Sequence, residues 1–166
     1  LEAWLRPTSD RQNPGAAPIA NRYVKSGNRT GWTLFQRAPN SQSAGTDGVG
    51  WNFRMYTGTG GSGQDVVTGV PYKLGEWQHL VVTWTPLAKS GTTGAKWTGT
   101  LTAYVNGERA ASKESVLYTA NTSPTEDGSP ASDLAVGAYN AASGLGSNPF
   151  EGDIDEVAFY GGYLLK

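Results

Sequence analysis

Apolar and polar residues alternate in short runs along most of this chain, and glycine, proline, asparagine or serine separates one run from the next. Alternation with a period of two sends successive side chains to opposite faces of a β-strand, and helical periodicity is scarce. The longest run covers 76–86 and predicts a central strand. Its two faces would carry Trp77, His79, Val81 and Thr83 on one side, and Gln78, Leu80, Val82 and Trp84 on the other.

Shorter runs of the same kind predict the remaining strands. They cover 1–7, 19–26, 32–38, 51–57, 64–68, 99–105, 108–113, 115–119, 133–139 and 150–160. Pro86 should end the central strand because proline cannot donate to an interior ladder. Asn106-Gly107 predicts a tight hairpin turn, since both residues tolerate positive φ. The pattern therefore predicts an all-β sandwich.

Composition and charge limit the number of domains and the classes of partner. The chain has 166 residues, 23 glycines, 9 prolines and a net charge of −1. That length suits one domain with a sizeable core, and we expect residues 1–166 to be a single domain excised from a longer chain, because Leu1 begins inside a strand. The lack of a basic stripe argues against nucleic acid, and no apolar run reaches membrane-spanning length. The absence of cysteine excludes disulfides and thiol chemistry.

Six sequence words occur in a fixed order: EAWLRP, GWTLFQ, GEWQHLVVTWT, LTAYVNGE, LAVGAYN and FEGDIDEVAFY. In order and spacing they resemble the laminin-G-like, concanavalin A-like lectin/glucanase superfamily in its bacterial LamG-type form. The resemblance covers nearly the whole chain. It implies a jelly roll of two antiparallel sheets that binds glycans or proteins, often together with a calcium ion.

The word GDIDEV offers a candidate metal site. Strict alternation would put Asp153 and Asp155 on one strand face and Glu156 on the other. Two carboxylates on one face suit a hard cation such as Ca²⁺. The resemblance implies that Asp155 contributes to a structural Ca²⁺. The alternative is that Asp155 and Glu156 only accept backbone hydrogen bonds and fix the strand.

The same stretch, GDIDEV, also bears on catalysis. Retaining glucanases of this fold carry E-x-D-x-x-E or E-x-D-x-E on one strand, but Val157 stands where the second glutamate would be. His79 is the only histidine, and we expect it to be a hydrogen-bonded core residue rather than a base. The sequence therefore predicts a domain that is not an enzyme. An acidic pair within a cleft would contradict this prediction.

Aromatic residues near the ends of the predicted loops are the candidates for sugar binding, because flat rings cover the apolar faces of sugars. We expect Trp4, Trp32 and Trp77 to pack in the core instead. The predicted ligand-binding residues are Trp51, Arg54, Tyr56, Trp84, Trp97, Tyr139 and Asn140, with Tyr104 also available.

These observations favour a non-catalytic carbohydrate-binding module of a larger secreted or cell-surface protein. Its partner would be a glycan or polysaccharide, with calcium as structural support. Two alternatives remain: a protein-interaction or adhesion module, and a structural accessory domain beside a catalytic domain. Solvent exposure of Trp84 and Trp97 would favour the first interpretation over the other two.

Overall fold

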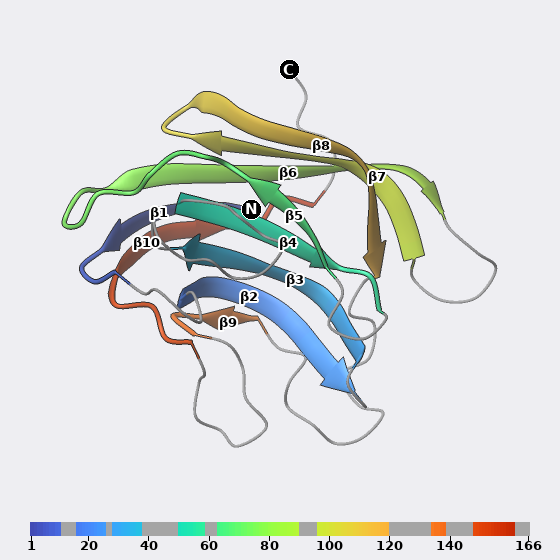
Figure 1. The fold of residues 1–166 in the computed structure, drawn as a ribbon, viewed down its shortest axis with the longest axis horizontal. Coiled ribbons are helices and arrows are strands. Elements are labelled where there is room, and N and C mark those ends of the chain that lie inside the picture. The colour runs from blue at the N-terminus through green and yellow to red at the C-terminus, as the bar shows by residue number, and fades with distance from the viewer. Residues whose placement is uncertain are drawn as a thin grey trace.

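The computed structural model describes residues 1–10, 16–25, 28–37, 50–58, 63–89, 96–119, 134–138 and 148–161, and these form strands without any helix (Figure 1). Accordingly, no helix in these ranges is long and apolar enough to cross a membrane. The strands are β1 (Glu2–Pro7), β2 (Ala16–Lys25), β3 (Asn28–Arg37), β4 (Gly50–Tyr56), β5 (Gly63–Val67), β6 (Gln78–Lys89), β7 (Lys96–Val105), β8 (Glu108–Thr119), β9 (Ala135–Val136) and β10 (Gly152–Ala158).

The strands form two five-stranded antiparallel sheets. Sheet A has the order β10-β1-β6-β7-β8, and sheet B has the order β5-β4-β3-β2-β9. The two layers are visible in Figure 1. The predicted all-β, two-sheet jelly-roll sandwich is confirmed. β6 is the central strand of sheet A, as its length and patterning predicted.

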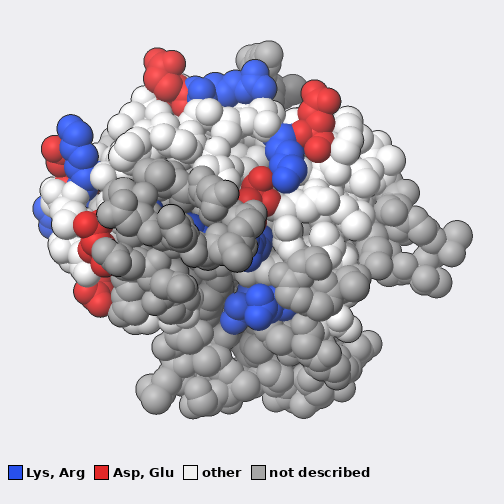
Figure 2. All heavy atoms as spheres, in the orientation of Figure 1, with Lys and Arg blue, Asp and Glu red and all other residues white. Residues whose placement is uncertain are grey.

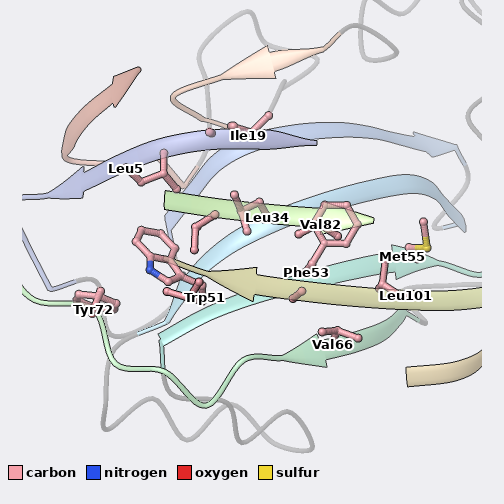
Figure 3. Packing of buried hydrophobic residues seen from close by; sticks show 14 of the residues in the cluster. Leu5, Ile19, Leu34, Trp51, Phe53, Met55, Val66, Tyr72, Val82 and Leu101 are labelled. Carbon is pink, nitrogen blue, oxygen red and sulfur yellow. The ribbon is translucent and has the colours of Figure 1, made fainter. Parts of the chain in front are cut away.

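The core lies between the sheets and is built from the inward-facing half of each alternating strand (Figure 3). Leu5, Leu34, Phe53 and Leu101 are almost fully buried there. Burying a side chain of this size stabilises the fold by about 1.5–3 kcal/mol. Because the alternate residues of sheet A point away from this core, they are free to build a surface site.

Trp51 ties the two sheets together at the centre of the core. It is fully buried on β4 of sheet B, and its indole N–H donates to Oε1 of Gln78 on β6 of sheet A at 2.8 Å. Tyr72 and Phe150 pack around the indole, with ring centroids 5.7 and 6.3 Å away. Gln78 also donates to the carbonyl of Pro71 at 3.3 Å, so both polar groups of this inter-sheet contact are satisfied.

The end of β6 differs from the prediction. Pro86 does not end the strand, which continues to Lys89. The register with β7 shifts between Pro86 and Ala88, so the proline lies at an irregularity where the regular ladder is already interrupted. That position removes the cost that a proline would carry inside a regular central strand.

β8 also differs, because the two strands predicted over 108–113 and 115–119 are one. Ser115 has a φ of +53°, and the register with β7 shifts there: Gly99 pairs with Val116, but Leu101 pairs with Lys113. A bulge therefore replaces the predicted break, and β8 covers the full length of its neighbour.

Candidate functional site

The candidate site lies on the outer face of sheet A, where β10, β1 and β6 are neighbours. Ala3 and Leu5 of β1 point into the core, so Trp4 and Arg6 point outward. Register then fixes their neighbours. Trp4 pairs with His79 on β6 and with Asp155 on β10.

Two tryptophans form the apolar part of this surface. Trp4 stacks on the His79 ring, with centroids 4.8 Å apart and planes inclined by 24°. Trp77, which immediately precedes β6, is 39% exposed, and the Arg6 guanidinium lies 5.2 Å from its ring centroid. The expectation that Trp4 and Trp77 pack in the core is wrong, because the alternation of β1 and β6 turns them to the opposite face.

A bulge in β10 brings two consecutive carboxylates to the same place. Glu2 pairs with Ala158 and Trp4 with Asp155, so three steps along β10 match two along β1. Glu156 lies at this bulge with a φ of +49°, a conformation that costs most non-glycine residues roughly 1–2 kcal/mol. The prediction that Glu156 faces away from Asp155 assumed strict alternation and is wrong at this point.

The tryptophans and carboxylates line one open pocket. Its volume is about 330 Å³, and its walls are Trp4, Trp77, Asp155 and Glu156. This volume falls at the lower end of the range typical of small-molecule sites. The pocket offers flat apolar surface on one side and hydrogen-bond acceptors on the other.

Charged groups beside the pocket are paired. Arg6 contacts Asp153, with both its Nε and Nη2 atoms 2.8 Å from Oδ2. Nε2 of His79 lies 2.7 Å from Oε1 of Glu2, and the Tyr160 hydroxyl donates to the other oxygen of Glu2 at 2.9 Å. The hydrogen bond from Tyr160, followed by that from His79, lowers the pKa of Glu2 below its usual range. The bond to Glu2 raises the pKa of Tyr160 in turn.

His79 therefore does not occupy the core position expected for it. It lies on the outer face, partly buried, between the Trp4 ring and the Glu2 carboxylate. Its backbone N–H also donates to Oδ1 of Asn106 in the β7–β8 turn at 2.8 Å. The histidine is hydrogen-bonded, as expected, and it serves as the backing of the Trp4 ring.

The described residues do not fit a calcium ion. Asp153 is held by Arg6, and Oδ1 of Asp155 accepts the backbone N–H of Glu156 at 2.8 Å. Within the described ranges, no group of three or more His, Cys, Asp or Glu side chains could hold a metal. A calcium site needs about six to eight oxygen ligands, which these two aspartates alone do not supply. Calcium binding stays a prediction.

Three of the predicted ligand-binding residues lie away from solvent. Trp51 and Tyr56 are fully buried, Trp51 in the core cluster and Tyr56 on the other face of β4. Arg54 forms a bidentate ion pair with Asp65 of β5, with N–O distances of 2.5 and 2.8 Å. As placed, these side chains support sheet B and are not available to a surface ligand.

The remaining predicted ligand-binding residues differ in their exposure and position. Trp84 is partly buried against the core, in edge contact with Tyr118. Trp97 is 36% exposed but lies near the opposite end of sheet A. Trp97 therefore meets the solvent-exposure criterion for a glycan-binding role, and Trp84 does not. Tyr139 and Asn140 lie outside the described residues.

Sequence reasoning missed Trp4, Trp77 and Glu156. The alternation within 1–7 and 76–86 contains a signal for the two tryptophans. Trp4 falls on the strand face opposite Leu5, and Trp77 on the face opposite Leu80, so both could have been expected to point away from the core. The bulge at Glu156 has no comparable signal, because glutamate is not a residue that favours positive φ.

Comparison with known proteins agrees with this architecture. The family model described as the concanavalin A-like lectin/glucanases superfamily matches residues 1–165. No curated protein matches the chain significantly. The family description covers both lectins and glucanases, so membership alone does not say whether the chain binds or cleaves a sugar.

Proposed function

Because the chain belongs to the concanavalin A-like lectin/glucanases superfamily, we propose that it is a non-catalytic carbohydrate-binding module whose site is the pocket on the outer face of sheet A. The single observation that carries this proposal is the pairing of exposed indole surface with carboxylates in one pocket. We further propose that it serves as a module of a larger secreted or surface protein.

The pocket provides both kinds of contact that a sugar needs. The exposed ring of Trp77 can cover the C–H face of a pyranose, and Trp4 extends this apolar surface. Asp155 and Glu156 can accept hydrogen bonds from sugar hydroxyls. Trp4 is backed by His79, and Trp77 has Arg6 over its ring, so the aromatic surface is held in place before the ligand arrives.

The acidic pair in the pocket, Asp155 and Glu156, is the kind of observation that counts against a non-catalytic domain, but the exposure of both side chains favours binding over catalysis. Asp155 and Glu156 are both exposed and adjacent on one strand. A glycosidase needs two carboxyl groups on either side of the scissile bond, one of them kept protonated by an apolar environment. Because both side chains are exposed, neither lies in the apolar environment that keeps a general acid protonated.

An adhesion role is the second candidate, and one observation favours it. Phe159 and Tyr160 follow β10 and are 46% and 57% exposed. Tyr160 lies beside the Glu2 carboxylate, and Phe159 lies against the Trp32 ring. Exposed aromatic residues near a polar rim also occur at protein interfaces. In that case, Phe159→Ala would weaken partner binding, and no glycan would compete.

A screen of soluble polysaccharides by affinity gel electrophoresis, followed by calorimetry, tests the proposal. We expect retention on at least one polysaccharide and loss of retention for Trp77→Ala. Trp97→Ala is the matched control, because Trp97 has similar exposure but lies away from the pocket. No retention on any polysaccharide would contradict the function, and loss of binding in Trp97→Ala alone would contradict the site. Release of reducing ends from a retained polysaccharide would show catalysis.

A further inference from the structure

The charges around the pocket are unevenly balanced. Two acidic residues of this region form ion pairs, Asp153 with Arg6 and Glu76 with Lys73 at 3.3 Å, and the Glu2 carboxylate is hydrogen-bonded to His79. Figure 2 shows the same tendency on one face of the molecule, where several acidic groups adjoin basic ones. Pairing of opposite charges is therefore common on this surface.

Asp155 and Glu156 differ from these pairs. Within the parts of the chain that the structure describes, neither carboxylate forms an ion pair with a basic side chain. Both are exposed and line the pocket. Arg6, the nearest cation along β1, is already neutralised by Asp153. The pocket therefore carries uncompensated negative charge.

The aromatic walls of the pocket also favour a positively charged ligand. The face of an indole attracts cations, and Trp77 already has the Arg6 guanidinium over its ring at 5.2 Å. An ionised carboxylate only accepts hydrogen bonds, whereas an ammonium group offers three donors and a positive charge. One ammonium could therefore donate to both carboxylates while its carbon skeleton lies against an indole.

We propose that the pocket binds a cationic sugar, namely a hexosamine unit with a free protonated amine within a polysaccharide. This inference rests on the proposed function and specifies its ligand class. A neutral sugar would leave the negative charge uncompensated, and an acidic sugar would be repelled by it. Acetylation of the amine would remove the charge and leave one N–H donor, so the N-acetylated sugar should bind less tightly.

Calorimetry with oligosaccharides of equal length provides the test. The probes are a glucosamine hexamer, an N-acetylglucosamine hexamer and a glucose hexamer, at a pH where the free amine is protonated. We expect the glucosamine hexamer to bind about tenfold more tightly than the other two, as suits charge-assisted hydrogen bonds at an exposed site. Its affinity should fall when ionic strength rises, because salt screens exposed charges.

The double variant Asp155→Asn/Glu156→Gln tests the two carboxylates. It keeps side-chain size and the acceptor for the Glu156 backbone N–H, and it should abolish the preference. The matched control is Glu108→Gln/Glu114→Gln, which changes the net charge equally on β8 at the opposite edge of sheet A. We expect this control to keep the preference.

Each other outcome has a definite meaning. Equal or tighter binding of the neutral hexamers would overturn the cationic specificity and leave the proposed function in place. A preference that survives in Asp155→Asn/Glu156→Gln, or disappears in the β8 control, would overturn the assignment to this pocket. Equal binding of a lysine pentapeptide would also overturn it, because charge without a sugar would suffice. Failure of all three hexamers to bind would overturn the cationic-sugar assignment, and the polysaccharide screen would then decide separately whether the proposed function stands.

Discussion

Trp51 and Trp77 show how differently the two faces of sheet A use the same residue type. Trp51 lies against the inner face, has no exposed surface and donates its N–H to Gln78. Trp77 lies on the outer face, is 39% exposed and carries Arg6 over its ring. Trp77 and Gln78 are adjacent in sequence, so a single step along the chain separates core from pocket.

The difference teaches that register, and not residue type, decides the role of an aromatic side chain here. Trp51, between the sheets, stabilises their packing, whereas Trp77, one residue before the inward-facing Gln78, is turned to the outer face of sheet A. Substitutions at the two positions should therefore affect different measurements. The following predictions test that separation, from the largest expected effect to the smallest.

Trp51→Ala should have the largest effect. It removes a fully buried indole and leaves Oε1 of Gln78 without its donor, so we expect a loss of about 3–5 kcal/mol in the free energy of unfolding. Urea denaturation followed by circular dichroism measures it. Trp51→Phe should lose less because it keeps most of the apolar volume. A stable Trp51→Ala protein with weakened glycan binding would reverse the roles of the two tryptophans.

Trp77→Ala should weaken glycan binding and leave stability nearly unchanged. We expect a change of less than about 1 kcal/mol in the free energy of unfolding, as for most surface substitutions. Glycan affinity should fall about tenfold, since an aromatic stacking contact contributes about 0.5–1.5 kcal/mol beyond its buried area. Calorimetry on the folded variant measures the loss. A marked fall in thermal stability with unchanged affinity would show that Trp77 is structural.

Glu156→Gly should stabilise the protein while weakening binding. Glycine adopts positive φ without the strain that a side chain suffers, so we expect a gain of about 0.5–1 kcal/mol at the bulge. The affinity for a cationic sugar should fall because one carboxylate is lost. Thermal denaturation and calorimetry on the same sample measure both effects. Ala158→Gly, at an ordinary strand position, should not stabilise.

Glu2→Gln should change the acid limb of stability. The folded-state pKa of Glu2 is lowered, so its stabilising contribution is present above the unfolded pKa of about 4.3 and is lost as pH falls below that value. We expect Glu2→Gln to be less stable than the unmodified protein near neutral pH by under about 1 kcal/mol, since the group is partly exposed.

Stability curves between acidic and neutral pH measure the effect of Glu2→Gln, and its deficit should shrink toward acid. Tyr160→Phe removes the larger of the two hydrogen bonds and should reproduce part of it. A deficit that grows as pH falls would contradict the assignment to Glu2.

Removal of divalent cations should have the smallest effect. Asp153 is engaged by Arg6, and the described residues assemble no metal-binding group. Because Asp153 and Asp155 alone supply too few oxygen ligands to hold Ca²⁺ tightly, we expect EDTA to change the melting temperature and the glycan affinity less than any substitution above. A melting temperature that rises on addition of Ca²⁺ would contradict this expectation and support the calcium prediction made from Asp153 and Asp155.

Much of the fold could be predicted from the sequence because alternation is a local signal. The face assignments of 76–86 are confirmed, and the turn at Asn106-Gly107 joins β7 to β8. The candidate site was harder to predict from the sequence. Which strands lie side by side is a long-range property, so the meeting of Trp4 with Asp155 could not be seen from either segment alone. The bulge at Glu156 depends on that pairing and was missed for the same reason.

The pocket joins β1, near the start of the sequence, to β10, near its end. During synthesis on the ribosome, Trp4 and Trp77 emerge long before Asp155 and Glu156. A nascent chain would therefore carry an aromatic surface without its acidic half until the last strand has been made. Binding at the proposed site would then require that β10 has been made and paired with β1, so a product terminated before Gly152 should not bind the proposed glycan.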